Sequence, residues 1–175
     1  MQEKKSESID EFLARMSDSL EVFESTPAQE LTEIEKWVLE YEQLDDETIA
    51  VKTSLIDVFL RQYYYGKGLS DEINKVEVPR MRATFSTWRN IRTLSYKRMP
   101  EEKHQKLARI TEELEYKDVA IFAFRTAKEY KEKVDTLLIG TDPARSARVN
   151  YQAFKIIENT AIEAQRIEDE MHTSH

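Results

Sequence analysis

The chain contains no cysteine, few helix-breaking residues and no long hydrophobic run. The absence of cysteine excludes disulfide bonds, thiolate metal sites and cysteine nucleophiles. Three glycines and four prolines in 175 residues, against abundant Glu, Lys, Ala, Leu and Arg, favour helices. No stretch approaches the ~18 consecutive apolar residues that a membrane span requires, and the charged N-terminus does not have the pattern of a signal peptide. We therefore expect a cytoplasmic protein with no membrane partner and no cofactor.

Apolar residues recur at spacings of three and four, the spacing that places them on one face of a helix. They predict helices at residues 8–24, 27–44, 46–65 and 79–99, a short helix from residue 70, and three more segments that begin near residues 101, 118 and 142. No segment shows the alternation of a strand. The sequence predicts an all-α fold, an irregular bundle of about six to seven helices around a single core. We expect one domain over residues 1–175, with residues 1–7 and 172–175 disordered.

Charge is distributed unevenly along the chain, although the whole is acidic with a net charge of -8. Residues 73–109 hold ten basic and three acidic residues, a net charge of +7, whereas residues 1–72 carry -11 and residues 110–175 carry -4. The central basic segment is the main candidate for a binding surface.

The helix expected at residues 79–99 should carry basic residues on both sides of its apolar face. That face consists of Met81, Phe85, Trp88, Ile91 and Met99. The candidate binding residues beside it, or at its end, are Arg80, Arg82, Arg89, Tyr96, Lys97 and Arg98.

One arginine, Arg92, falls within the apolar face of this helix. A buried guanidinium needs a carboxylate or a gap to solvent. Asp57, in the most apolar of the expected helices, needs a partner for the same reason. We expect the two to form a buried ion pair.

Three interpretations of the basic segment remain open. Its side chains could pair with the acidic helices expected at residues 8–24 and 27–44, bind an acidic protein partner, or contact nucleic acid. The low pI of about 5.1 argues against nucleic acid unless the basic patch is segregated from the acidic surface. An apolar groove beside Trp37 or Trp88 is an alternative docking surface for a protein, and self-association is also open.

Two acidic motifs provide an enzymatic alternative. Glu112-x-x-Glu115 and Glu132-x-x-Asp135 resemble the motifs of all-α nucleotide pyrophosphatases of the MazG type, in which two antiparallel helices hold Mg²⁺. The resemblance implies a magnesium-dependent pyrophosphatase with these four residues as metal ligands. That family has a turn between the motifs, whereas residues 119–131 contain neither glycine nor proline.

A second resemblance covers about forty residues. The layout of Leu69–Ile73, Arg89–Arg92, Pro100–Lys103 and Leu107 is similar to the helical domain of archaeal GINS replication subunits. It implies a protein associated with nucleic acid in DNA replication or regulation. The function that we expect from the residues themselves is a non-enzymatic one, a helical protein-interaction or scaffold protein with a basic central helix.

Overall fold

The computed structural model describes residues 31–65 and 68–173, and all regular structure within these ranges is helical. Six helices have ten or more residues: α3 (Glu33–Glu42), α4 (Asp46–Tyr64), α6 (Val78–Lys97), α7 (Glu102–Glu112), α8 (Tyr116–Thr136) and α9 (Asp142–Thr173). A four-residue helix, α5 (Leu69–Glu72), and a 3-10 turn, η2 (Ile73–Lys75), connect α4 to α6. The predicted all-α bundle with a single core is confirmed, while the helix expected at residues 8–24 lies outside the described residues. No helix of the described part is long and apolar enough to span a membrane.

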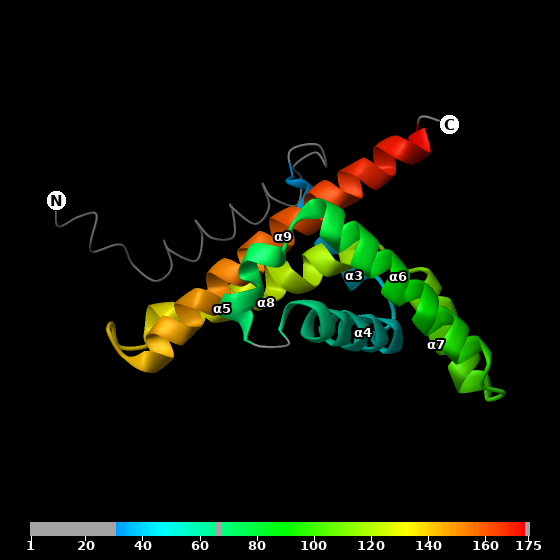
Figure 1. Ribbon diagram of the computed structural model, residues 1–175, viewed down its shortest axis with the longest axis horizontal. Helices are drawn as coiled ribbons and strands as arrows, with labels where there is room; N and C mark the ends of the chain where they lie inside the picture. The colour runs from blue at the N-terminus through cyan, green and yellow to red at the C-terminus, as the bar shows by residue number, and fades with distance from the viewer. Residues whose placement is uncertain (1–30, 66–67, 174–175) are drawn as a thin grey trace, which may run out of the picture.

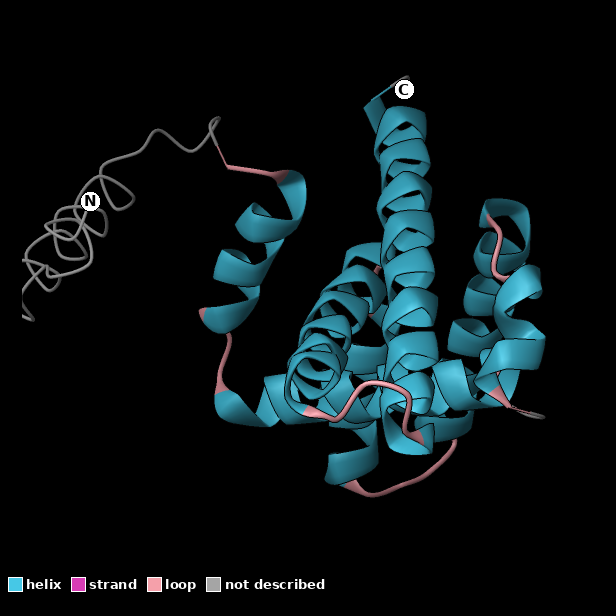
Figure 2. Ribbon diagram, turned by 90° about the vertical axis from the view of Figure 1, so that its left-hand side faces the viewer, coloured by secondary structure: helices cyan, strands magenta, loops and turns pink. Residues whose placement is uncertain are grey.

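Two helical hairpins and one crossing helix form the bundle (Figure 1). Helices α8 and α9 pack along each other and are joined by residues 137–141, and α6 and α7 form a second, shorter hairpin. Helix α4 contacts α6, α7 and α8, while α3 packs on α8 and α5 packs on α9. A view turned by 90° shows that short loops connect the helices of the described part (Figure 2).

An aromatic cluster forms the centre of the core where α4 meets α6. Phe59 of α4 is fully buried, and its ring centroid lies 5.1 Å from that of Phe85 and 5.4 Å from that of Trp88. Tyr63 and Tyr64, one turn further along α4, complete the ring contacts of Phe59 at 5.3 Å and 6.0 Å. The apolar face of α6 is narrower than predicted, because Ile91 is 61% exposed, and it is shorter, because α6 ends at Lys97, before Met99.

Local hydrogen bonding sets the starts of two helices. Helix α3 begins at Glu33, where the Thr32 side chain accepts a hydrogen bond from the Glu35 backbone N–H and so caps the first turn, and the predicted start at residue 27 lies outside the described residues. The chain breaks at residues 113–115, so α8 begins at Tyr116 rather than near residue 118, with Glu115 as its N-cap. Asp118 instead completes a capping box, in which its carboxylate accepts from the Glu115 backbone N–H at 2.8 Å.

The two ends of the α8–α9 hairpin also depart from the prediction. Helix α8 ends at Thr136, so Leu137 and Leu138, which continue the apolar spacing of the predicted helix, lie in the connecting loop, and Leu138 is 78% exposed. Gly140 follows with a φ of +87°, a conformation that favours glycine. At the other end, His172 and Thr173 belong to α9, although the sequence suggested a disordered tail from residue 172.

Four tyrosines make the stability of the fold sensitive to high pH. Burial raises the pKa values of the Tyr41, Tyr64, Tyr65 and Tyr116 hydroxyls above that of a solvent-exposed tyrosine. A raised pKa in the folded state means that the contribution of each group to the free energy of unfolding is fully present below about pH 10 and is lost as pH rises through the raised value. We expect these four phenolates to appear only together with unfolding above about pH 10. A single pH titration measures both quantities, with tyrosinate absorbance reporting ionisation and circular dichroism reporting helix content. Ionisation of these groups while the helical signal is intact would contradict the expectation.

Candidate interaction surface

The ten basic side chains of residues 73–109 divide into three groups by what they contact. Four form ion pairs with carboxylates, at nitrogen–oxygen distances of 2.6 to 3.5 Å: Lys75 with Glu72, Arg82 with Glu168, Lys97 with Glu112, and Lys106 with Glu47. Three place a guanidinium 5.4 to 5.6 Å from the centre of an aromatic ring: Arg80 over Tyr64, Arg89 over Phe85, and Arg92 over Trp88. The remaining three, Arg98, Lys103 and Arg109, have no ion-pair, hydrogen-bond or ring partner among the residues that the structure describes.

Most of the predicted binding residues on α6 are therefore engaged within the molecule. Arg89 donates a hydrogen bond to the Leu114 carbonyl in the α7–α8 connection, and Arg80 donates to the Tyr63 carbonyl of α4 at 3.4 Å. Tyr96 is half-buried and accepts from Arg92 at 3.5 Å. Among the described residues, the acids that pair with the basic segment come from α4, α5, α7 and α9 and none comes from α3, while the other acidic helix of the pairing interpretation, at residues 8–24, lies outside them. Of the six predicted residues, Arg98 is exposed and has no such contact within the described ranges.

The expected ion pair between Asp57 and Arg92 is wrong, because the structure gives each residue a nearer partner. Asp57 accepts a hydrogen bond from Arg61 Nε at 3.0 Å, one turn along the same helix, and its side chain is 37% exposed. Arg92 lies over the Trp88 ring, so its guanidinium packs on an aromatic face instead of entering the core.

The four acidic residues suggested as magnesium ligands do not form one site. Glu112 ends α7 and Glu115 caps the start of α8, whereas Glu132 and Asp135 lie near the far end of α8. At 1.5 Å per helical residue, Glu115 and Glu132 are about 25 Å apart. Within the described residues, no group of three His, Asp or Glu side chains could hold a metal ion. The four residues therefore do not have the arrangement that the alternative interpretation requires, because most of the continuous helix α8 separates residues that two antiparallel helices would bring together.

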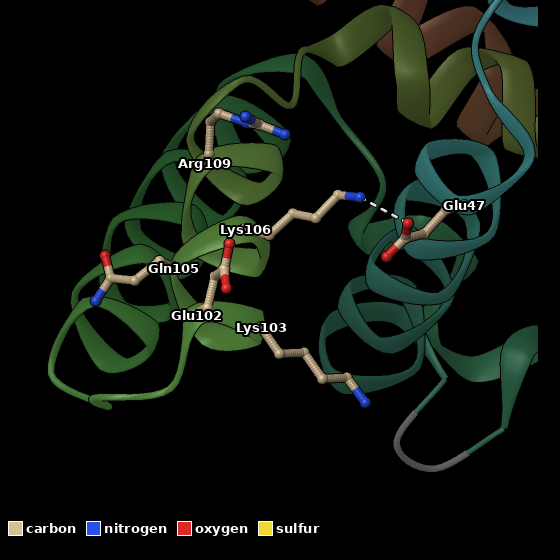
Figure 3. A pocket seen from close by; sticks show the side chains of 6 residues that line it. All are labelled: Glu47, Glu102, Lys103, Gln105, Lys106 and Arg109. Carbon is tan, nitrogen blue, oxygen red and sulfur yellow. Dashed lines mark hydrogen bonds and ion pairs between the residues drawn. The ribbon is translucent and has the colours of Figure 1, made fainter.

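An open groove of about 580 Å³ lies between the start of α4 and the exposed side of α7. Lys103, Lys106 and Arg109 line it from α7, on successive turns at a spacing of three residues (Figure 3). Lys103 and Arg109 are exposed and Lys106 is partly exposed, although Ile110 of the same helix is buried. Lys106 reaches across to Glu47 of α4 at 2.6 Å. Glu102 and Gln105 complete the lining.

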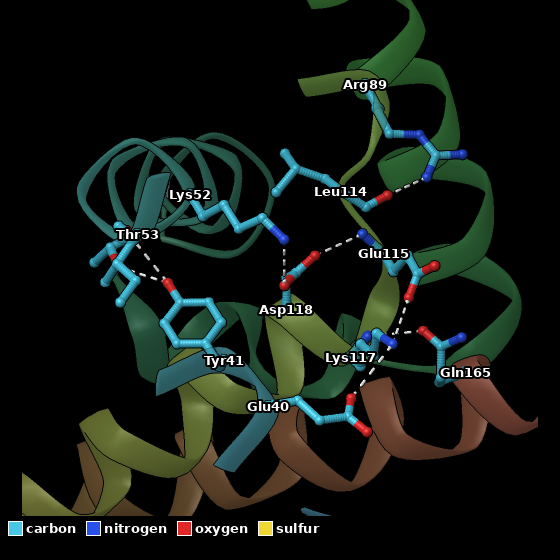
Figure 4. Close-up of polar contacts among 11 residues, drawn as sticks. Glu40, Tyr41, Lys52, Thr53, Arg89, Leu114, Glu115, Lys117, Asp118 and Gln165 are labelled. Atoms are coloured by element: carbon cyan, nitrogen blue, oxygen red, sulfur yellow. Dashed lines mark hydrogen bonds and ion pairs between the residues drawn. The ribbon is translucent and has the colours of Figure 1, made fainter. Parts of the chain in front are cut away.

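A second polar junction lies where α3, α4 and α8 meet (Figure 4). Asp118 is 4% exposed, and it receives Lys52 Nζ of α4 at 3.3 Å as well as the Glu115 backbone N–H. Burial raises the pKa of the Asp118 carboxyl, and the ion pair with Lys52 opposes this effect. Tyr41 of α3 is within hydrogen-bonding distance of the Thr53 hydroxyl, at 3.0 Å. This junction ties three helices together.

The two tryptophans named as possible groove residues lie in different environments. Trp88 is 3% exposed and belongs to the aromatic core, so its side chain does not line a groove on the surface. Trp37 is half-buried and lines a small cavity of about 150 Å³ together with Tyr41, Leu44 and Ile121.

No family model, curated protein or solved structure matches the chain. The function is therefore argued from the surface of the molecule itself. Sequence reasoning placed Lys103, Lys106 and Arg109 in the basic segment but did not single them out, although their three-residue spacing indicates one helix face. It also missed the Lys52–Asp118 pair. The Glu115-x-x-Asp118 spacing is that of a capping box, so it could have placed Asp118 at the start of a helix, but it does not indicate Lys52 as a partner.

Proposed function

We propose that this protein is a non-enzymatic protein-binding module that holds an acidic segment of a partner in the groove between α4 and α7. The observation that carries the proposal is the pair Lys103 and Arg109, which line this groove without an acidic partner among the described residues. Lys106 adds a third cation, whose present partner Glu47 is 63% exposed and can be exchanged for a carboxylate of the partner.

The electrostatics favour a short acidic protein segment over nucleic acid. The whole chain has a net charge of -8, and two carboxylates, Glu47 and Glu102, line the groove itself. Screening confines the attraction of the three cations to about 8–10 Å at physiological salt. A polyanion longer than the groove is repelled by the acidic surface beyond it, whereas a segment of a few acidic residues is not.

Reversing the two unpaired charges tests the proposal. The variant K103E/R109E is expected to bind the partner about tenfold more weakly or worse, because it replaces two exposed attractions by repulsions. Co-purification of the full chain from lysate of its source identifies the partner, and calorimetry with the purified partner then gives Kd for each variant. The matched control is K128E/R148E, which makes the same charge change at exposed residues of α8 and α9.

Equal affinity of K103E/R109E and the wild type for this partner would contradict the proposal. So would retention of the wild type on heparin with a steep salt dependence that K103E/R109E removes, because that result identifies the groove as a nucleic-acid surface.

A further inference from the structure

Helix α3 is attached to the rest of the molecule by a row of exposed ion pairs. Glu33 pairs with Arg166 of α9 at 3.3 Å, Glu40 with Lys117 of α8 at 3.9 Å, and Glu42 with Arg125 of α8 at 3.4 Å. All six side chains are 35% to 69% exposed. Ion pairs at such exposure are weakened strongly by salt.

Apolar contacts of α3 with the core, and the contact of the Tyr41 hydroxyl with that of Thr53 at 3.0 Å, add to this attachment. Ile34 and Tyr41 are buried, Trp37 and Val38 are half-buried, and Leu39 is 44% exposed. A ten-residue helix is marginal in water by itself, so α3 stays folded because it is docked.

A hydrophobic and charged surface of α8 lies beneath α3. Ile121 and Asp118 of α8, with Lys52 of α4, line the small cavity whose other side is formed by Trp37 and Leu44. Lys117 and Arg125 stand at the edge of this surface, and Arg125 also lies over the Tyr41 ring at 5.0 Å. The surface therefore combines the apolar side chain of Ile121 with cations that pair with acids of the docked helix.

We propose that α3 is a displaceable strap, and that its release uncovers on α8 and α9 a docking groove for an acidic amphipathic helix of a partner. The chemistry of that partner follows from the resident helix. Lys117, Arg125 and Arg166 are placed to meet carboxylates on a helix whose apolar side faces Ile121. This groove is separate from the one between α4 and α7, so the strap can fail where the proposed function holds, and the reverse.

Hydrogen exchange on the wild-type chain tests the strap without any substitution. Raising the salt from low ionic strength to about 1 M NaCl reduces the Debye length to about 3 Å. Backbone exchange in residues 33–42 is expected to accelerate about tenfold, as three exposed pairs are screened, while exchange in residues 116–136 stays unchanged. Equal acceleration in both ranges, or none in residues 33–42, overturns the proposal.

A peptide with the sequence of residues 31–44 tests the groove. In the full-length variant E33K/E40K/E42K, the lysines introduced in α3 are repelled by the cations of α8 and α9. We expect this variant to bind the fluorescently labelled peptide at least tenfold more tightly than the wild type does at low salt. The control chain E129K/E132K/D135K makes the same charge change on exposed positions of α8 and is expected to behave as the wild type. A peptide in which the three acids are replaced by lysine is expected not to bind.

Three outcomes would contradict the proposed docking groove. The first is equal affinity of the peptide for E33K/E40K/E42K and for the wild type, and the second is an equal gain of affinity in E129K/E132K/D135K. The third is binding of the lysine-substituted peptide. Circular dichroism of E33K/E40K/E42K checks that the bundle is intact. If that variant does not fold, hydrogen exchange on the wild type still tests whether α3 is displaceable.

Discussion

Replacing Asp118 by alanine is expected to lower the free energy of unfolding by about 4 kcal/mol, because it leaves the ammonium group of Lys52 buried without its carboxylate. Lys52 is 14% exposed and has Asp118 as its ion-pair partner at 3.3 Å. The substitution also removes the hydrogen bond to the Glu115 backbone N–H, and with it half of the capping box at the start of α8. Urea denaturation followed by circular dichroism measures the change.

Two further variants separate the charge from the cap. Asp118→Asn keeps an oxygen that can accept from the Glu115 N–H, so we expect it to cost about 2 kcal/mol, less than alanine. The double variant K52M/D118N removes both charges and is expected to recover most of that loss, since a buried pair replaced by uncharged residues of similar volume is often neutral. If Asp118→Ala costs less than about 1 kcal/mol, the pair does not tie α4 to α8.

Phe59→Ala is expected to destabilise the protein by about 4 kcal/mol, through the loss of a fully buried ring and the cavity it leaves. The ring of Phe59 contacts Tyr63 and Tyr64 on its own helix and Phe85 and Trp88 on α6, so the cavity opens between two helices. Urea unfolding gives the free energy, and near-ultraviolet circular dichroism reports the packing of the tryptophan.

Phe59→Leu is the matched control, because it retains an apolar side chain of intermediate volume and should cost about 1.5 kcal/mol. A similar small loss for alanine would show that α4 and α6 close over the missing ring.

The fold was predictable because its determinants are local. Helix existence follows from apolar spacing and from caps within four residues, and the main errors fell at helix ends. Thr32-x-x-Glu35 and Glu115-x-x-Asp118 carry capping-box spacings that locate two of these ends. The position of the exposed loop at Leu137 and Leu138 could not be predicted from the sequence, since both residues continue the apolar spacing of α8.

The candidate surface was less predictable because the exposure of each helix face depends on how the helices pack against one another. Arg82 and Arg89 look like an exposed basic flank on a helical wheel, yet Glu168 and the Leu114 carbonyl cover that flank. Lys52 and Asp118 are 66 residues apart in the sequence, and no local pattern links them. Periodicity identifies a face of a helix, and only tertiary packing decides whether that face reaches solvent.

Helix α9 follows all the other described helices in the chain, and it completes the interior of elements that are synthesised before it. Its side chains Phe154, Ile157, Ala161 and Ala164 are buried, and it packs on α8, α6 and α5. A nascent chain that has not reached residue 164 therefore carries the inner faces of these helices in contact with water. The bundle can close only once α9 has been synthesised, so the described fold is completed in one late step rather than helix by helix.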